Sequence, residues 1–299
     1  MRVINKAIVK FTNLLPENIV YIFAKKYIAG KTLDEAIKVV KDLNSKGIMA
    51  TIDALGEDIT NKQEAIAAKD ECLRILDAIE QNKLNSNLSL KPSQMGIKID
   101  FQLAYVHIAE ICERAKKYSN FVRIDMEDSS LTEATLELYK ELRKKYDNVG
   151  VVLQAYLKRT LNDIITLRPL NPNFRLCKGI YIEPESIAYQ SKKKVRRNFI
   201  EALETMFKNG MYVGIATHDE YLIKEAYRLI EELKISKDKY EFQMLYGVKE
   251  KLRDKINSDG HRIRIYCPFG EKWHKYSMRR LQENPNIAWH ITKSIFFPN

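Results

Sequence analysis

The most chemically suggestive part of the sequence is a short run near its C-terminal end. Tyr276, Arg279, Arg280 and Glu283 are spaced i, i+3, i+4 and i+7, so in a helix they share one face. Two adjacent guanidinium groups can bind a carboxylate in bidentate fashion, and Glu283 can orient one of them. The same spacing also occurs on ordinary solvated helices, so spacing alone leaves both interpretations open.

Polar residues also follow the ends of short β-type runs along the chain. They are Asp53, Lys91, Asp125, Gln154, Lys178, Thr217, His218, Tyr246 and Tyr266. If the runs are parallel strands of a barrel, these side chains meet at its C-terminal face, where barrel enzymes carry their active sites. We expect Val, Ile and Leu inside such a barrel, so this polar set favours a functional role. Taken singly, Asp53 could shape a turn and Thr217 could cap a helix.

Together these groups suit a small zwitterionic substrate. Arg279 and Arg280 would bind its carboxylate, and Asp125 would offset a cationic amine. Tyr266 and Tyr276 would form apolar walls with polar tips. An amino acid fits this description, but these residues alone do not say which reaction it undergoes.

The elements that must position these residues alternate in type from about Gly47 onward. Eight β-type runs alternate with helical segments, which is the number of units that closes a (βα)8 barrel. The runs are residues 48–52, 87–90, 121–124, 150–153, 174–177, 212–216, 240–245 and 262–265. An open doubly wound sheet is the alternative, but its G-x-G-x-x-G motif is absent, as is a Walker A motif. Capping boxes at Thr32, Thr60, Ser130 and Thr217 predict helix starts.

Residues 1–46 do not follow this alternation. They are predicted to form a helical arm that precedes a single barrel domain over residues 47–299. The whole chain has 299 residues, of which 45% are hydrophobic, a fraction that excludes a fully disordered protein. No apolar run approaches the ~18 residues of a membrane span, and the first residues do not read as a signal peptide.

The chain is basic, with 50 Lys and Arg against 39 Asp and Glu and a net charge of +11. This charge suits an anionic partner, although a basic solvated surface is the simpler explanation of most of the excess. The basic cluster at 192–197 lacks interleaved aromatic residues, so no nucleic-acid partner is expected. The four cysteines and five histidines are scattered, which indicates reduced thiols and no metal site.

Several longer runs form recognisable motifs, at residues 122–127, 175–181, 216–218, 241–247, 266–270 and 276–283. Taken in order, they resemble the motifs of proline dehydrogenase in its short, single-function bacterial form. The resemblance extends from about Asp53 to Glu283 and implies a distorted (βα)8 barrel that holds FAD and is preceded by helices. It implies oxidation of L-proline to Δ1-pyrroline-5-carboxylate, the first step of proline catabolism to glutamate. A hydride would pass from substrate Cδ to flavin N5, and the electrons would then pass to a membrane quinone.

The resemblance also implies roles for individual residues. Asp125 looks like the acidic residue of the site and Arg175 like the arginine near flavin N5, so these two are the expected catalytic pair. The implied substrate-binding set is Lys91, Leu245, Tyr266, Tyr276, Arg279, Arg280 and Glu283. The implied cofactor-binding set is Met126, Gln154, Arg175, Lys178, Gly179, Ile180, Tyr181, Thr217 and His218. Ile180 departs from the family, which often has Ala there, and predicts a bulkier pocket wall.

We therefore expect a cytoplasmic enzyme with L-proline and a quinone as partners. The quinone and the basic charge suggest peripheral contact with the inner face of the cell membrane, while the oligomeric state stays open. The ring of Tyr266 should crowd a 4-hydroxyl group and so favour proline over hydroxyproline. Two other classes remain as alternatives. One is a basic barrel protein that binds nucleic acid or an anionic surface without catalysis; the other is a flavin-free lyase with Lys91 or Lys178 as Schiff-base lysine.

Overall fold

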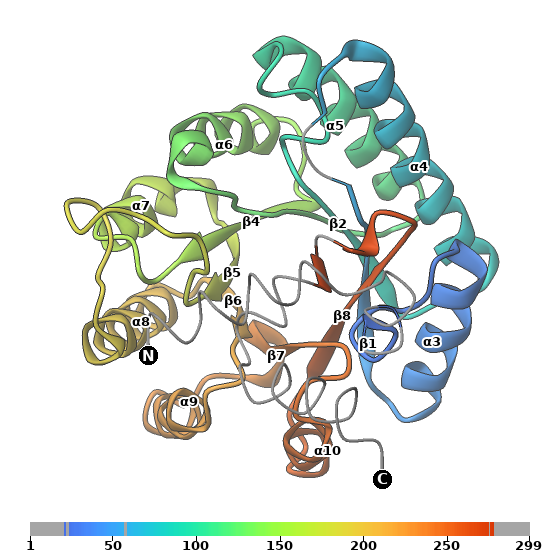
Figure 1. The fold of residues 1–299 in the computed structure, drawn as a ribbon. Coiled ribbons are helices and arrows are strands. Elements are labelled where there is room, and N and C mark those ends of the chain that lie inside the picture. The colour runs from blue at the N-terminus through green and yellow to red at the C-terminus, as the bar shows by residue number, and fades with distance from the viewer. Residues whose placement is uncertain (1–20, 22–23, 57–58, 275, 278–299) are drawn as a thin grey trace, which may run out of the picture.

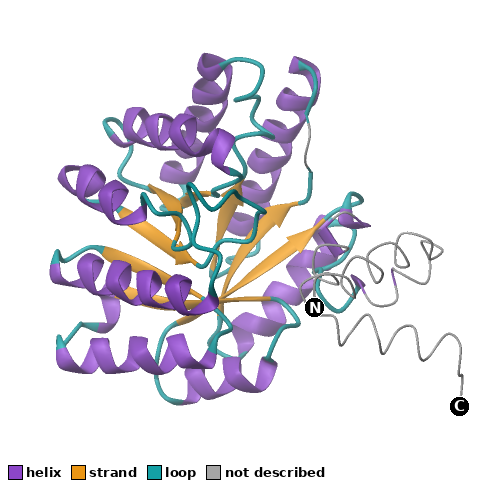
Figure 2. Ribbon diagram, turned by 60° about the vertical axis from the view of Figure 1, so that its left-hand side comes forward, coloured by secondary structure: helices purple, strands orange, loops and turns teal. Residues whose placement is uncertain are grey.

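The computed structural model describes residues 21, 24–56, 59–274 and 276–277. In this part of the chain eight parallel strands form a closed barrel in the order β1 to β8, and β8 pairs back onto β1. The helices surround the strands (Figure 1), and a view from the side shows the strands enclosed by them (Figure 2). The predicted (βα)8 barrel is therefore confirmed.

Strands and helices alternate along the chain. The strands are β1 (Met49–Ala54), β2 (Ser86–Leu90), β3 (Val122–Ile124), β4 (Val149–Gln154), β5 (Asn173–Cys177), β6 (Tyr212–Ala216), β7 (Tyr240–Leu245) and β8 (Ile263–Phe269). The helices are α3 (Leu33–Ser45), α4 (Lys62–Gln81), α5 (Phe101–Lys117), α6 (Ser129–Arg143), α7 (Thr160–Leu167), α8 (Lys192–Lys208), α9 (Glu220–Glu232) and α10 (Glu250–Ser258). The predicted runs match the strands to within one or two residues, except that β8 continues to Phe269. None of the described helices is long and apolar enough to cross a membrane.

Three helices begin at a residue other than the predicted one. Their N-caps are Asn61 for α4, Asp128 for α6 and Asp219 for α9. The capping boxes predicted at Thr60, Ser130 and Thr217 are therefore wrong by one or two residues, because a neighbouring Asn or Asp caps the helix instead. The box at Thr32 is confirmed, since the side chains and backbones of Thr32 and Glu35 pair reciprocally.

The interior of the barrel is polar, so the expectation of Val, Ile and Leu there is wrong. Arg175 of β5 crosses it to hydrogen-bond both Asp125, just after β3, and Gln243 of β7. Arg123 of β3 likewise reaches the backbone oxygen of Asn173 on β5. Apolar residues occupy the alternate strand positions and form the core against the helices, as a strand's period of two requires. Examples are Val122, Ile124, Phe174, Leu176, Phe242 and Met244.

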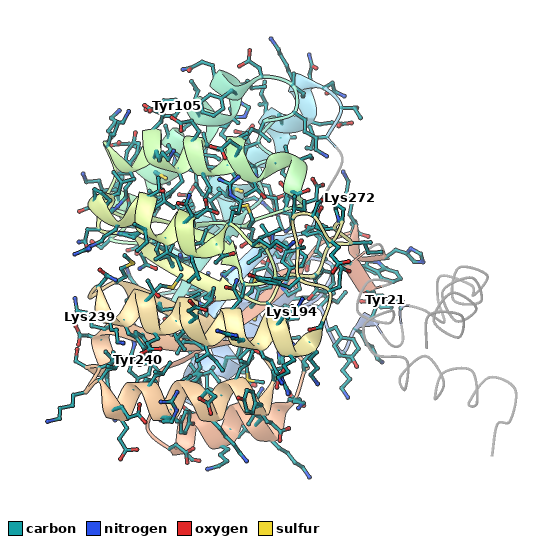
Figure 3. All side chains as sticks on the ribbon, turned by 90° about the vertical axis from the view of Figure 1, so that its left-hand side faces the viewer. Tyr21, Tyr105, Lys194, Lys239, Tyr240 and Lys272 are labelled. Carbon is teal, nitrogen blue, oxygen red and sulfur yellow. The ribbon has the colours of Figure 1, made fainter. Side chains whose placement is uncertain are left out.

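The described part of the predicted N-terminal arm lies against the barrel. Helix α3 packs on β1 and β8, and the Ala29 N–H donates to the Pro268 oxygen at 2.7 Å. The division of the chain at residues 46 and 47 stays a prediction. Figure 3 shows Lys194 and Lys272 at one end of the molecule, which is the end where the strands finish. Lys239 and Tyr240, at the start of β7, lie at the opposite end.

Candidate active site

A cavity of about 710 Å³ opens at the C-terminal end of the strands. Its volume lies within the ~300–1,000 Å³ range of small-molecule and cofactor sites. The described residues of the implied catalytic, substrate-binding and cofactor-binding sets all line it: Lys91, Asp125, Met126, Gln154, Arg175, Lys178, Gly179, Ile180, Tyr181, Thr217, His218, Leu245, Tyr266 and Tyr276. Arg279, Arg280 and Glu283 lie outside the described residues. The strand-end residues Asp53 and Tyr246 are not among those that line the cavity.

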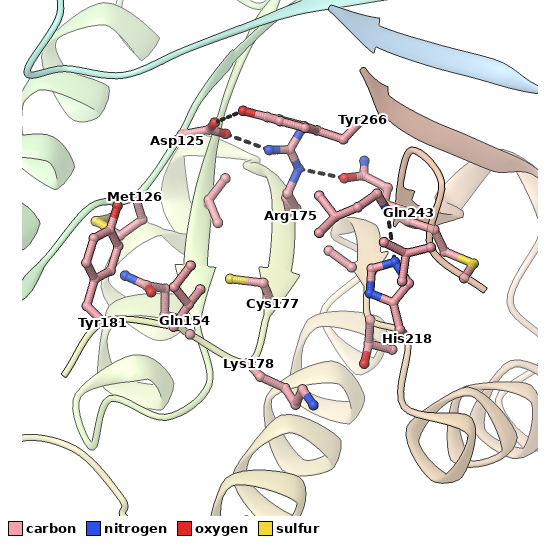
Figure 4. A pocket seen from close by; sticks show the side chains of 18 of the residues that line it. Asp125, Met126, Gln154, Arg175, Cys177, Lys178, Tyr181, His218, Gln243 and Tyr266 are labelled. Carbon is pink, nitrogen blue, oxygen red and sulfur yellow. Dashed lines mark hydrogen bonds and ion pairs between the residues drawn. The ribbon is translucent and has the colours of Figure 1, made fainter. Parts of the chain in front are cut away.

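Asp125 is the centre of a hydrogen-bonded cluster at the floor of this cavity (Figure 4). Its Oδ1 accepts from Arg175 Nη1 at 2.5 Å and from Ser89 Oγ at 2.7 Å, and its Oδ2 accepts from the Tyr266 hydroxyl at 2.8 Å. The Arg175 guanidinium also lies over the Tyr266 ring, 5.3 Å from its centroid. Three donors from three different strands therefore converge on this one carboxylate.

Lys91 is held on one wall of the cavity by a buried ion pair. Its Nζ lies 2.8 and 3.1 Å from the two oxygens of Asp53, the carboxylate of which is 1% exposed. Burial by itself disfavours the charged amine, but the carboxylates of Asp53 and Asp125 outweigh it and raise the pKa of Lys91. Burial raises the pKa of Asp53, against the pull of Lys91. Lys91 is therefore a fixed cation rather than a neutral nucleophile.

The loop after β5 brings a glycine and an aromatic ring into close contact. Gly179 has a φ of +97°, and a Cβ there would lie 2.1 Å from the Tyr156 ring. Only glycine fits this position, since the backbone is left-handed and the ring fills the space of a side chain. The loop continues through Ile180, which is 43% exposed, to Tyr181, the hydroxyl pKa of which burial raises.

Two further polar side chains of the cavity have fixed orientations. Gln154 donates from Nε2 to the Glu127 carbonyl at 2.8 Å. His218 Nε2 accepts from the Leu245 N–H at 2.9 Å, which assigns the ring proton of the neutral imidazole to Nδ1.

Lys178 lies on the outer side of the cavity near a carboxylate. Its Nζ is 3.7 Å from Asp219, which also accepts from Arg196 at 2.6 and 2.9 Å. Burial of Asp219 acts against its charge, but Arg196 and Lys178 lower its pKa overall. Two cations share one carboxylate here, so this side of the cavity is electropositive.

The segment before α3 also reaches the cavity, which the sequence did not predict. Tyr27 is 7% exposed and lines the cavity. The chain crosses close to the loop after β7, where a Cβ on Gly247 would lie 1.8 Å from the Lys26 carbonyl oxygen. Gly247 has a φ of +71°, so both the conformation and the close approach require glycine.

Sequence reasoning gave no site role to two buried polar residues, Ser89 and Gln243, and considered Asp53 only as one of the strand-end residues. Asp53 holds Lys91, while Ser89 and Gln243 hold Asp125 and Arg175. A signal for them is present in the polar alternation of Glu241 and Gln243 along one strand, because both faces of a barrel strand are buried. Within the described residues, no three His, Cys, Asp or Glu side chains are grouped as a metal site.

Comparison with known proteins gives one consistent result. Residues 36–292 match the family model described as proline dehydrogenase. Proline dehydrogenase 2 of Bacillus subtilis (strain 168) is 41% identical over 267 residues, 89% of this chain and 88% of that protein. Proline dehydrogenase 1 of Bacillus subtilis subsp. natto is 38% identical over 291 residues, 97% of this chain and 95% of that protein. The crystal structure of proline utilization A from Bdellovibrio bacteriovorus, inactivated by N-propargylglycine, has a TM-score of 0.82 at 26% identity, and covers 91% of this chain and 34% of that one.

Proposed function

The chain belongs to the proline dehydrogenase family, and from this premise we propose that its cavity binds FAD and L-proline side by side. The protein is an oxidoreductase that acts on proline, in the first step of proline catabolism. In the proposed reaction, proline would give up a hydride from Cδ to flavin N5 and a proton from its nitrogen to solvent, which would leave the C=N bond of Δ1-pyrroline-5-carboxylate. The observation that carries the proposal is the convergence of Asp125, Arg175, Lys91 and Tyr266 on one cavity.

The chemistry of the lining residues fits a flavin dinucleotide. The electropositive side at Lys178 suits a pyrophosphate, and Gly179 in the loop beside it lines the same cavity. Gln154 and His218 offer oriented polar groups for a heteroaromatic ring. When bound, FAD would supply the two-electron acceptor that no amino-acid side chain provides.

The substrate carboxylate would bind at the Lys91 side of the cavity. Lys91 is fixed and protonated there, so it can offer N–H donors without moving. Arg279 and Arg280 would complete this subsite. Since their guanidinium groups are always charged, a bound carboxylate would balance them.

Asp125 and Arg175 would act on the two sides of the reacting centre. Asp125 already accepts three hydrogen bonds, so it would stabilise charge near the proline nitrogen as an anion rather than take up a proton there. Arg175 would donate a hydrogen bond on the flavin side of the site, and its positive charge would stabilise the negative charge that a reduced isoalloxazine ring carries. Tyr266 would place its ring against the substrate and its hydroxyl on Asp125.

The structure weakens the flavin-free lyase alternative. A Schiff-base lysine must be neutral to attack a carbonyl, whereas the Asp53 ion pair keeps Lys91 protonated. Lys91→Met that still binds FAD but loses affinity for proline would support the substrate-binding role proposed above.

Electron transfer to a quinone at the membrane is the second half of the proposal. The support for it is the family membership together with the net charge of +11, which favours an anionic surface. Sedimentation with anionic vesicles should show binding at low salt that weakens at high salt, since ions screen such contacts. If the protein bound the vesicles at neither salt concentration, membrane contact would be contradicted.

The whole proposal is tested by the visible spectrum of the purified protein under anaerobic conditions. We expect a flavin spectrum that bleaches when L-proline is added and bleaches far less with hydroxyproline. A flavin spectrum that ignores proline would overturn the substrate assignment. A colourless protein that neither binds added FAD nor oxidises proline with it would overturn the cofactor assignment and favour the binding-protein alternative.

A further inference from the structure

A continuous chain of side-chain hydrogen bonds runs through the barrel interior to Arg175. Arg264 of β8 donates to Glu241 of β7 from Nε at 2.6 Å and from Nη2 at 3.2 Å. Gln243 donates from Nε2 to the Glu241 carboxylate at 2.6 Å and accepts from Arg175 Nε at 2.5 Å. Arg175 then donates to Asp125. The chain thus links the lower part of the barrel to the floor of the cavity.

Glu241 fixes the orientation of the Gln243 amide in this chain. Burial acts against its charge, but the Arg264 guanidinium outweighs burial and lowers the pKa of Glu241 to about 2. An ionised carboxylate only accepts, so the amide nitrogen of Gln243 must face Glu241. The amide oxygen of Gln243 must then face Arg175, and a flipped amide would break both contacts.

A glycine on the strand between them makes this contact sterically possible. Gly214 of β6 pairs in register with Arg175 on one side and with Glu241 on the other. A Cβ on Gly214 would lie 2.4 Å from Gln243 Nε2. Because β6 presents no side chain there, Arg175 of β5 and Gln243 of β7 can meet across it.

We infer that Gln243, oriented by Glu241, is a positioning residue that sets the direction of the Arg175 guanidinium. With Nε bound to Gln243 and Nη1 bound to Asp125, the guanidinium plane has one orientation, and its remaining N–H groups have one direction. This inference rests on the proposed function, in which Arg175 donates to the flavin. Gln243 itself need not touch the substrate's reacting atoms.

The test compares Gln243→Met with a matched interior variant, both loaded with FAD. Gln243→Met keeps the length of the side chain and removes both hydrogen bonds. The control, Thr51→Val, removes a buried hydrogen bond from Thr51 to Asn87 that does not involve Arg175. We expect Gln243→Met to lower kcat roughly tenfold or more with little change in KM, and to make the flavin midpoint potential more negative. Thr51→Val should lower thermal stability but keep the wild-type potential and kcat.

A swap of the two polar groups separates orientation from simple packing. In the double variant Glu241→Gln with Gln243→Glu, the new amide donates to the new carboxylate, which accepts from Arg175. The hydrogen-bond chain is restored with its total charge unchanged. We expect kcat to recover to within about threefold of wild type, while Gln243→Glu alone stays low because two carboxylates then face each other.

Three outcomes would overturn the inference. Gln243→Met with wild-type kcat and potential would contradict it, as would equal losses in Gln243→Met and Thr51→Val. A folded, FAD-loaded double swap that recovers nothing relative to Gln243→Glu would also contradict it, and this comparison decides the matter if Gln243→Met does not fold. If the flavin absorbance of the wild-type protein did not bleach with proline, the proposed function itself would be overturned. Failure of the inference about Gln243 and failure of the proposed function are therefore distinguishable.

Discussion

Asp125 is the residue on which most of the cavity floor depends. It accepts hydrogen bonds from β2, from β5 and from β8 through Ser89, Arg175 and Tyr266. Its removal would leave the buried Arg175 without its anionic partner, which is costly in a low-dielectric site.

Replacement of Asp125 by Asn should therefore reduce turnover strongly. We expect kcat/KM for proline to fall by roughly a hundredfold, which corresponds to about 3 kcal/mol for one broken buried charge pair. Tyr266→Phe removes only one hydrogen bond to the same carboxylate and should cost about tenfold or less. Steady-state kinetics on both variants check this order, and a larger loss in Tyr266→Phe than in Asp125→Asn would contradict it.

Asp53 should matter for substrate binding although it does not line the cavity. Asp53→Asn leaves Lys91 without the charge that holds it, so we expect KM for proline to rise about tenfold or more with a smaller change in kcat. The control is Asp42→Asn, which breaks the exposed pair with Lys46 and should leave KM unchanged. Direct titration with a proline analogue measures the same effect, and equal affinities for both variants would show that Asp53 has no such role.

At the scale of elements, the loop after β5 shapes one side of the cavity. It begins at Lys178 and Gly179, directly beyond the last residue of the strand. The Tyr156 ring, from the loop after β4, fixes its path. Neighbouring loops at the end of the barrel therefore support one another through packing.

Gly179→Ala should displace this loop and weaken FAD binding. The new Cβ would overlap the Tyr156 ring in a backbone conformation that also disfavours it, so we expect FAD affinity to fall at least tenfold while the barrel stays folded. Gly210→Ala is the matched control, because Gly210 also has a positive φ, of +69°, but has nothing within 4 Å of a new Cβ. That variant should lose about 1 kcal/mol of stability and keep FAD affinity. Fluorescence titration with FAD distinguishes the two, and equal affinity in both would contradict the role of Tyr156.

The order and approximate bounds of the strands were predictable from the sequence, because each strand is a short apolar run flanked by polar residues. Most of the strand-end candidates line one cavity, since strand ends of a parallel barrel share one face, although Asp53 and Tyr246 do not line it and the roles of the others stay predictions. What could not be predicted was contact across the barrel. The pairing of Asp53 with Lys91, and of Gln243 with Arg175, depends on side-chain directions that a one-dimensional pattern does not contain.

At the scale of the whole molecule, charged side chains lie in the interior of the barrel, and apolar side chains fill the layer between the strands and the surrounding helices. Glu241 and Arg264 form a buried pair, with Glu241 2% and Arg264 9% exposed. Arg123 is 2% exposed, and its burial together with the nearby charge of Arg175 lowers its pKa to about 9. The stability of the barrel should accordingly depend on pH through these interior groups.

Acid should weaken the barrel through Glu241. Its pKa is about 2 in the folded protein against an ordinary value of 4.5, so the folded state favours the ionised form. The stabilisation is complete above about pH 4.5 and is lost as the pH falls toward 2. Glu241→Gln lacks this contribution, so we expect the wild type to exceed it by a few kcal/mol near pH 6 and by much less near pH 3. Denaturant unfolding at both pH values measures the gap, and a constant gap would contradict this assignment.

The polar interior also governs how such a sequence can diverge. An apolar residue facing a helix can be exchanged for another of similar volume with small cost, so the outer positions of the strands can drift independently. Arg175, Gln243, Glu241 and Arg264 each satisfy a neighbour, and Gly214 leaves the space in which two of them meet. A change at one of them leaves a buried partner unpaired, so these positions can change only in compensating combinations. Descendants of this chain should therefore vary freely around the barrel while inheriting its centre as a single unit.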